Sequence, residues 1–296
     1  MSSPVDVVVV SYNSRDDLRS CIEPLVGAEG VSVIVVDNAS TDGTLASVAD
    51  LAIVTRALPD NRGFAAGCNE GWRAGSSPLV LFLNPDTVID EAALRRLADA
   101  LARDRRLGAV APQIRNSDGS LDHSQRRFPR LRSTFARALL LHRAFPTAEW
   151  VDEVVRDPAA YQYPGSPEWA SGAALLVRRA FLDELGGLDE RFFMYCEDAD
   201  LCQRLWSAGH GIRYEPAAVI VHRGGSSAPR TSLLPVLTAS RIAYARKHRG
   251  PAAAALERAG LGLEALIRAF IARGGRHARA GHLGALRVAL LPARTH

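Results

Sequence analysis

The sequence predicts an α/β protein built on a mostly parallel β-sheet with helices on both faces. Runs of β-branched residues alternate with segments of helical periodicity over roughly the first 115 residues, which is the pattern of a covered parallel sheet. Polar turns rich in Asp, Asn, Ser and Gly follow several of these runs directly, at the strand ends where open α/β sheets bind ligands. A chain of 296 residues, 47% of them hydrophobic, can form one large domain or one domain with an appendage.

The strands expected in the first half are short apolar runs that stop at polar turns. They cover residues 5–10, 31–36, 51–55, 79–83 and 109–112. Helices are expected between them, because residues 16–26 and 91–103 place apolar side chains at helical spacing.

The second half of the chain is less regular. Its features are a basic, partly amphipathic stretch at 126–150, a loop entering a strand at 169–177, a helix at 197–208, and two short strands at 212–214 and 218–221. From Pro251 onward the chain is rich in Ala, Leu, Arg and Gly, and we expect a helical extension there.

Charge and cysteine content narrow the class of protein. The net charge is +4, and Arg residues concentrate at 126–132 and after Arg246. Such a basic stretch either binds anionic lipid, phosphorylated substrates or nucleic acid, or is simply a solvated surface. The four cysteines form no CxxC pair, and the chain starts directly with a strand-like run rather than a signal peptide. No run reaches 18 uncharged apolar residues, so we expect a cytoplasmic protein with reduced thiols and no transmembrane helix.

Two acidic side chains follow predicted strands at the binding edge of the sheet. Asp37 closes one strand and can accept from a base N–H or a ribose hydroxyl, although Asp37 and Asp42 can equally cap a turn and a helix. Asp86 follows another strand in the turn Asn84-Pro85-Asp86, which Pro85 stiffens. Mg²⁺ and Mn²⁺ prefer one or two carboxylates with phosphate oxygens, so Asp86 is either a metal ligand or part of an ordinary Pro-Asp turn.

Two further candidates lie late in the chain. Glu197 and Asp198 open a predicted helix after the aromatic run at 192–195, and acids are favoured there by the helix dipole alone. The functional alternative makes Asp198 a general base whose pKa is raised by its aromatic neighbours. His222 ends the last predicted strand, as a metal ligand or as a surface histidine.

Transfer of a sugar from a nucleotide diphosphate needs three kinds of group in the protein, and these residues provide a candidate for each. The nucleotide needs hydrogen-bond partners, the diphosphate needs positive charge, and the acceptor hydroxyl needs a base. The motifs in which they stand resemble those of glycosyltransferase family 2, and particularly its bacterial rhamnosyltransferase-like branch. The resemblance covers about residues 4–228 and is carried by residues 10–13, 37–44, 61–69, 84–86, 169–173, 192–201 and 222–226.

The resemblance implies a GT-A fold, with a Rossmann-like sheet and a C-terminal helical extension, and assigns roles to particular residues. Asp86 corresponds to the metal-binding Asp of the family's DXD-type motif, but Asn84 stands where many relatives carry a second Asp. His222 is implied as the late metal ligand, and Asp198 as the catalytic base with Glu197 as its structural neighbour. The implied nucleotide-sugar site comprises Ser11, Tyr12, Asn13, Asp37, Asn38, Arg62, Gly67, Asn69, Asn84 and Asp86, and the implied acceptor side comprises Trp169, Ser171 and Gly172.

The resemblance also implies a reaction. It is a metal-assisted direct displacement, with Mg²⁺ or Mn²⁺, that inverts the anomeric carbon. We expect transfer of a single sugar, because the string at 203–206 lacks the spacing of the QxxRW motif of processive synthases. The first expectation for the donor is dTDP-L-rhamnose, with a UDP-hexose as the alternative, and the expected acceptor is a cell-envelope glycan or a polyprenyl-diphosphate-linked sugar.

The expected domains are a catalytic domain at 1–228, with a nucleotide-binding part at 1–115 and an acceptor-binding part at 116–228, and a helical extension at 229–296. The basic amphipathic stretches at 130–145 and 252–272 either lie at the inner face of the cell membrane or pack on the catalytic domain or on a second copy in a homodimer.

Three rival classes remain at this point. A non-catalytic sugar-nucleotide binding protein would not need both Asp86 and Asp198. A nucleotidyltransferase would carry a Gly-rich basic loop after the first strand, where this chain has the residues at 11–14. A nucleic-acid reader is suggested only by the basic charge, since the strands lack interleaved aromatic and basic residues, and we expect no nucleic-acid partner.

Overall fold

The computed structural model describes residues 3–146, 148–224, 231–271 and 275–291, and these residues form two compact units. The first unit is made of Met1–Arg126, Arg156–Glu190 and Glu197–Ser227, and the second of Arg127–Val155, Arg191–Cys196 and Ala228–His296. The expected domain boundary between residues 228 and 229 lies outside the described residues.

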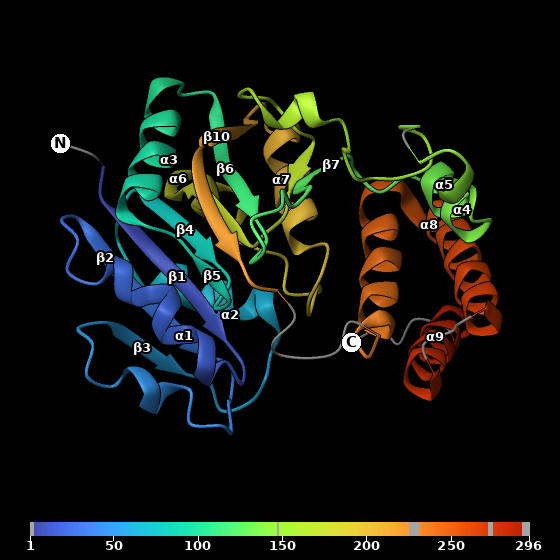
Figure 1. Cartoon of the computed structure of the whole chain (residues 1–296), viewed down its shortest axis with the longest axis horizontal. Helices are drawn as coiled ribbons and strands as arrows, with labels where there is room; N and C mark the ends of the chain where they lie inside the picture. Colours follow the sequence, from blue (N-terminus) through green and yellow to red (C-terminus); the bar gives the residue numbers. More distant parts are fainter. Residues whose placement is uncertain (1–2, 147, 225–230, 272–274, 292–296) are drawn as a thin grey trace. The chain divides into compact units, whose positions relative to one another are not determined.

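An eight-stranded, mostly parallel sheet is the centre of the first unit (Figure 1). Its strand order is β3-β2-β1-β4-β9-β6-β10-β5, and β9 and β5 are the antiparallel members. A separate ribbon pairs β7 with β8. The strands are β1 Val5–Ser11, β2 Val31–Asp37, β3 Val54–Ala57, β4 Leu79–Leu83, β5 Thr87–Val88, β6 Leu107–Arg115, β7 Gln125–Arg126, β8 Trp169–Ala170, β9 Ala174–Arg178 and β10 Gly211–His222.

Helices cover both faces of this sheet because the side chains of β1 alternate between them. Val7 and Val9 join one hydrophobic core with α1 (Arg15–Ile22) and α3 (Glu91–Arg103). Val8 and Val10 face α2 (Phe64–Ala74) on the other side. The remaining helices of this unit are α6 Arg179–Leu185 and α7 Glu197–Ser207, with 3₁₀ turns at Glu23–Leu25, Leu45–Val48 and Pro158–Tyr161.

Helix α2 was not among the predicted elements, and its glycines explain how it packs. A Cβ on Gly67 would lie 2.6 Å from Val10 Cγ1, and a Cβ on Gly71 would lie 2.3 Å from Val8 Cγ1. The two glycines, one turn apart, therefore allow the helix backbone to approach β1 closely. Glycine lowers intrinsic helix propensity, so this segment is helical because of tertiary packing.

Several predicted elements differ from the structure in their bounds. The third strand begins at Val54 rather than residue 51, and the helix expected to run to residue 26 ends at Ile22 and continues as a 3₁₀ turn. The two short strands expected at 212–214 and 218–221 are one strand, β10, with a break in register between Glu215 and Val219. The mostly parallel sheet and the C-terminal helices are confirmed.

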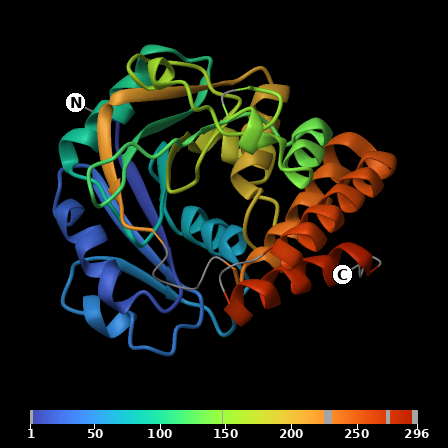
Figure 2. The same cartoon turned by 45° about the vertical axis from the view of Figure 1, so that its right-hand side comes forward.

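The second unit is helical. It contains α4 Leu131–Ala138, α5 Leu141–Ala144, α8 Leu234–Ile271 and α9 Gly275–Leu290. Helix α8 bends at Gly250, whose φ of 85° is not helical, because the following Pro251 disfavours a helical residue before it. Figures 1 and 2 both show α9 lying along α8.

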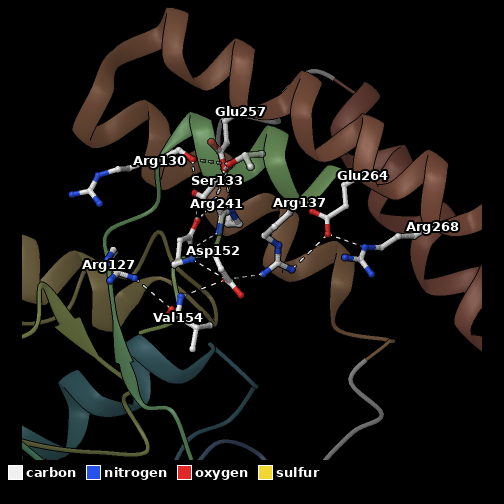
Figure 3. Close-up of polar contacts among 12 residues, drawn as sticks. Arg127, Arg130, Ser133, Arg137, Asp152, Val154, Arg241, Glu257, Glu264 and Arg268 are labelled. Carbon is white, nitrogen blue, oxygen red and sulfur yellow. Dashed lines mark hydrogen bonds and ion pairs between the residues drawn. The ribbon is translucent and has the colours of Figure 1, made fainter. Parts of the chain in front are cut away.

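A buried ion network holds the second unit together (Figure 3). Arg241 of α8 bonds Glu153 at 2.7 and 2.8 Å and Glu257 at 2.9 Å. Thr134 of α4 donates to the same Glu257 at 2.9 Å. Arg137 lies 3.8 Å from Asp152 and 3.5 Å from Glu264. Because an unpaired buried charge is costly, removal of one of these partners would destabilise the packing of α4 against both halves of α8.

Within the described ranges, no helix is long and apolar enough to span a membrane. The four cysteines are free thiols, and all are buried.

Candidate active site

Asp86 and His222 meet at the carboxyl edge of the sheet. The turn after β4 leads into β5, whose Thr87 pairs with His222 at the end of β10. The backbone N–H of Arg223 donates to Asp86 O at 2.9 Å, which holds the two strand ends together. As a result, Asp86 Oδ1 lies 3.2 Å from His222 Nε2, and the side chains are only 12% and 21% exposed.

This pair fits a divalent cation. Two neighbouring ligand atoms of an octahedral ion, each about 2.1 Å from it, lie about 3.0 Å apart, close to the observed separation. Carboxylate oxygen and imidazole nitrogen are donors that Mn²⁺ accepts. No group of three or more His, Cys, Asp or Glu side chains that could hold an ion exists within the described part of the chain. Two side chains would therefore share the ion with oxygens from substrate or water.

A second cluster lies where β1 and β2 end, next to each other on the same edge. The Asp37 carboxylate accepts from Ser11 Oγ at 3.0 Å and from the Ser40 backbone N–H at 3.0 Å. Asn13 donates its backbone N–H to Ser40 Oγ at 2.9 Å and accepts from the Thr41 N–H at 2.9 Å. The structure thus brings Ser11, Asn13 and Asp37 together. Ser40 Oγ also donates to Asp37 at 2.5 Å, and since a carboxylate has about four lone-pair positions, Asp37 keeps about one of them for a ligand.

The neighbouring residues have different surroundings. The Asp42 carboxylate accepts from the Arg15 N–H at the start of α1 at 3.1 Å and from the Thr44 N–H at 3.0 Å, which is the capping alternative. Tyr12 is 43% exposed at the same strand end. Asn38 is buried and joins β2 to the next loop, since it accepts from the Arg62 N–H at 2.9 Å and donates to Gly63 O at 3.0 Å.

The loop and helix at 61–69 are tied to a segment much later in the chain. Asn69 is buried and donates to Leu188 O at 2.8 Å and to Glu190 Oε1 at 2.9 Å. Arg62 Nη2 lies 3.1 Å from Glu190 Oε2 in a partly exposed ion pair. These contacts join Asn69 to the segment at 188–190, and its support of the loop at 61–67 stays a prediction. Glu190 was not predicted, because nothing local in the sequence indicates its pairing with Arg62.

Asp198 lies at the start of α7 beside the β8 segment. Its carboxylate accepts from the Gly172 backbone N–H at 3.0 Å and from the Ala199 N–H at 2.8 Å. A Cβ on Gly172 would touch Asp198 at 3.3 Å, so Gly172 allows this close approach. Trp169 and Ser171 lie on the same segment, and the structure therefore groups the three predicted acceptor-side residues with Asp198.

The two carboxyl groups of the pair differ in their surroundings. Burial raises the pKa of Glu197 well above its ordinary value, and the neighbouring Asp198 charge raises this pKa further. Glu197 Oε2 is buried and has no hydrogen-bond partner in the described residues, which fits a protonated group. Burial also raises the pKa of Asp198, but the N–H groups of Gly172 and Ala199 oppose the rise by bonding its charged form.

Asn84 continues β4 through its backbone, since its N–H donates to Ala173 O at 2.9 Å. The motif that begins at His222 continues into Gly225 and Ser226, which lie outside the described residues.

Comparison with known proteins identifies the class to which this fold and site belong. The family model described as "Glycosyl transferase family 2" matches residues 6–150. The chain is 34% identical over 245 residues to the N-acetylglucosaminyl-diphospho-decaprenol L-rhamnosyltransferase of Mycobacterium tuberculosis, over 78% of this chain and 79% of that protein. It is 28% identical over 232 residues to rhamnosyltransferase WbbL of Escherichia coli K12, over 74% and 83% of the two chains.

Solved structures agree in fold. A mannosyltransferase from Pyrobaculum calidifontis, in complex with GDP-Man and Mn²⁺, matches with a TM-score of 0.59 at 18% identity, over 98% of this chain and 88% of that one. Glucosyl-3-phosphoglycerate synthase from Mycobacterium tuberculosis matches with a TM-score of 0.58 at 17% identity, over 84% and 81%. The protein is a glycosyltransferase with a GT-A fold. It belongs to glycosyltransferase family 2 and is similar to the rhamnosyltransferases of that family. This membership decides against a nucleotidyltransferase.

Proposed function

We propose that the protein transfers a single L-rhamnose from dTDP-L-rhamnose to a sugar of a cell-envelope glycan or of a polyprenyl-diphosphate-linked acceptor, with inversion. The observation that carries the proposal is the 3.2 Å approach of Asp86 Oδ1 to His222 Nε2 at the carboxyl edge of the sheet. The similarity to two rhamnosyltransferases supports the choice of sugar. A UDP-hexose donor is the second candidate, since glycosyltransferases with other donors share the fold.

The nucleotide side of the proposed site is the edge formed by β1, β2 and the loop before α2. Asp37 and Asn13 present acceptors to the base and ribose, and Arg62 exchanges its exposed ion pair with Glu190 for the donor diphosphate. Gly67 lets α2 lie close to β1, and Asn69 keeps the loop in place. The set proposed for the nucleotide sugar is Ser11, Tyr12, Asn13, Asp37, Asn38, Arg62, Gly67, Asn69, Asn84 and Asp86.

In the chemical step, Asp198 takes the proton of the acceptor hydroxyl, which displaces the nucleotide from the anomeric carbon. Burial raises the pKa of Asp198, and a raised pKa makes its carboxylate a stronger base. Trp169, Ser171 and Gly172 form the acceptor side, and Glu197 supports Asp198 as a neutral neighbour. A Mg²⁺ or Mn²⁺ ion held by Asp86 and His222 would stabilise the charge of the leaving diphosphate.

The donor assignment is tested by nucleotide-sugar hydrolysis and transfer assays with dTDP-L-rhamnose, UDP-glucose and UDP-galactose in Mn²⁺ or Mg²⁺. We expect turnover of dTDP-L-rhamnose to exceed that of either UDP-hexose by ~10-fold or more in kcat/KM, a ratio that one or two differential contacts produce. Faster turnover of a UDP-hexose would show that the donor is a UDP-hexose and not dTDP-L-rhamnose. Binding of a nucleotide sugar without any turnover would instead support the non-catalytic alternative.

We propose a peripheral membrane contact through α9, at the inner face of the cell membrane. Arg279, Leu283, Arg287 and Leu290 are exposed at helical spacing along one face of α9, while Ala285 and Ala289 are buried on the opposite face. Helix α9 has no acidic residue, so this stripe combines apolar area with positive charge. It replaces the segments at 130–145 and 252–272 as our first choice for the contact. The catalytic part is proposed to be residues 1–228, with 229–296 as the helical extension.

Co-sedimentation with lipid vesicles tests this contact. The protein should bind vesicles of phosphatidylcholine with added phosphatidylglycerol, should bind pure phosphatidylcholine weakly, and should dissociate at high salt. The double variant Leu283→Gln/Leu290→Gln should lose binding, whereas Tyr163→Gln, which changes an exposed side chain of the other unit, should keep it. A stable homodimer that this double variant dissociates would show that a second copy, and not lipid, covers the stripe.

A further inference from the structure

Arg126 stands on a short ribbon next to the proposed base. Strand β7 pairs with β8 so that Arg126 lies opposite Trp169 and Gln125 lies opposite Ala170. Directly opposed side chains of an antiparallel pair stand on the same face, so Arg126 and Trp169 are neighbours on one face of the ribbon. Both side chains are only partly buried, which leaves this face accessible.

The other face of the ribbon is fixed in the core. Gln125 is buried, and its Nε2 donates to Ala160 O at 2.7 Å. The backbone N–H of Gln125 donates to the Tyr161 hydroxyl at 3.1 Å, and the Tyr161 ring packs against Tyr214 at 5.5 Å. The ribbon therefore cannot turn over, and Arg126 is held on the open face.

The same ribbon leads directly to Asp198. The Ser171 N–H donates to Ser124 O at 3.0 Å and extends the β7–β8 pairing by one bond. The next N–H, that of Gly172, donates to Asp198 Oδ2 at 3.0 Å. Burial raises the pKa of Asp198, and the positive charge of Arg126 opposes part of that rise. The pairing of β7 with β8 and the Gly172–Asp198 bond thus place Arg126 in the surroundings of Asp198.

The guanidinium of Arg126 differs from the other arginines of the first unit that lie near the core. Arg178, Arg179 and Arg204 each donate several hydrogen bonds to backbone or carboxylate oxygens. Arg126 has no hydrogen bond or ion pair from its side chain to any residue that the structure describes. A guanidinium carries five N–H donors in a planar fork that matches phosphate and carboxylate groups. Arg126 therefore offers its full donor set to a ligand on the open face.

We propose that Arg126 binds the anionic group of the acceptor, a phosphate carried on the acceptor sugar, while the Trp169 ring packs against that sugar. The assignment rests on the proposed function, because it presupposes that the acceptor hydroxyl lies at Asp198. An aromatic ring beside an arginine recognises both parts of a sugar phosphate, the apolar ring face and the charge. The enzyme then selects its acceptor by charge, through a residue separate from the Asp86–His222 pair.

Calorimetric titration of the protein saturated with dTDP and Mn²⁺ tests this assignment. The probes are N-acetylglucosamine 1-phosphate, the neutral methyl glycoside of N-acetylglucosamine, and methyl glucuronide, whose negative charge is a carboxylate at C6 instead of a phosphate at C1. The phosphate should bind ~10-fold or more tighter than the neutral glycoside, since a charged hydrogen-bonded pair contributes this much. Arg126→Gln should remove that preference, and Arg126→Lys should keep part of it because the charge remains but the fork is lost.

Arg106→Gln is the matched control, because it removes the same charge from a highly exposed residue paired with Asp104. The control should keep both the preference and the affinity for dTDP. The inference is wrong if the unsubstituted protein does not prefer the phosphate over the neutral glycoside, if methyl glucuronide binds as tightly as the phosphate, or if Arg126→Gln keeps the preference. If the inference about Arg126 fails but the proposed function holds, all variants should still bind dTDP with equal affinity. If the proposed function itself fails, the protein should neither bind dTDP nor turn over the donor.

Discussion

Asp198→Asn is expected to lower kcat for sugar transfer by roughly 10²- to 10⁴-fold, the contribution of a positioned general base. The amide keeps the size of the side chain and can still accept from the Gly172 N–H, which bonds the carboxylate at 3.0 Å. It cannot take a proton from the acceptor. Donor affinity should change little, and the measurement is transfer kinetics with saturating donor together with the Kd for dTDP.

Glu197→Gln is the matched control for this substitution. Burial and the adjacent Asp198 raise the pKa of Glu197 well above its ordinary value, which favours its protonated form, and an amide resembles that form in shape and charge. We expect kcat within about 5-fold of the unsubstituted enzyme, well below the contribution of a general base. If Glu197→Gln abolished transfer and Asp198→Asn did not, the base would be the other member of the pair.

The pH dependence of kcat should report the ionisation of Asp198. Only the ionised carboxylate accepts a proton, so activity is present above the pKa of Asp198 and is lost as the pH falls through it. Because burial raises this pKa, the acid limb of kcat should lie above the pH expected for an ordinary aspartate of about 3.9. The groups that share the surroundings of Asp198 are Glu197 and Cys202 on α7 and Arg126 on β7. An acid limb unchanged in Asp198→Asn would assign it to another group.

Asp86→Asn is expected to lower kcat/KM by roughly 10²- to 10³-fold and to weaken activation by Mn²⁺, as removal of one stabilising group at a developing charge does. Among the residues that the structure describes, Asp86 and His222 form a pair without a third His, Cys, Asp or Glu ligand, so the loss of the carboxylate leaves a single imidazole donor from that pair. The ion would then depend on substrate oxygens. Steady-state rates measured across a Mn²⁺ titration separate weaker metal binding from a slower chemical step.

His222→Gln should cause a smaller loss than Asp86→Asn, because a neutral ligand contributes less than a charged one to holding a divalent cation. Asp118→Asn is the control, since it removes a carboxylate from an exposed turn bonded to Ser120. A Mn²⁺ activation curve in Asp86→Asn that matches that of the unsubstituted enzyme would exclude Asp86 as a ligand.

Local features of the sequence predicted the fold class and the positions of the acidic residues on it. Buried strands such as Val5–Ser11 are mostly apolar, β-branched runs, and the polar turns after them are equally visible in the sequence. Predicting the ends of elements was harder. The two short strands expected before His222 are one strand, because pairing with β6 continues across an irregularity that no local pattern indicates.

Contacts between residues of the candidate site were harder to predict from the sequence. Asn69 and Glu190 form part of one network, and neither residue has a local feature that indicates the other. Helix α2 was missed because its glycines, which lower helix propensity, are needed where Val8 and Val10 press against it. Arg126 was seen only as part of a basic stretch, and its place beside Asp198 depends on the β7–β8 ribbon.

The sequence by itself determined that this protein has a covered parallel sheet with Asp37 and Asp86 at its carboxyl edge, and that Asp198 begins a helix. These are properties of short segments, in which apolar periodicity and turn residues act over a few positions. Only the tertiary structure decided that Asp86 meets His222, that Arg62 pairs with Glu190 and that Arg126 reaches the surroundings of Asp198. The physical reason is that these approaches require strand pairing and helix packing between distant segments, whose contacts stabilise one arrangement of the whole chain.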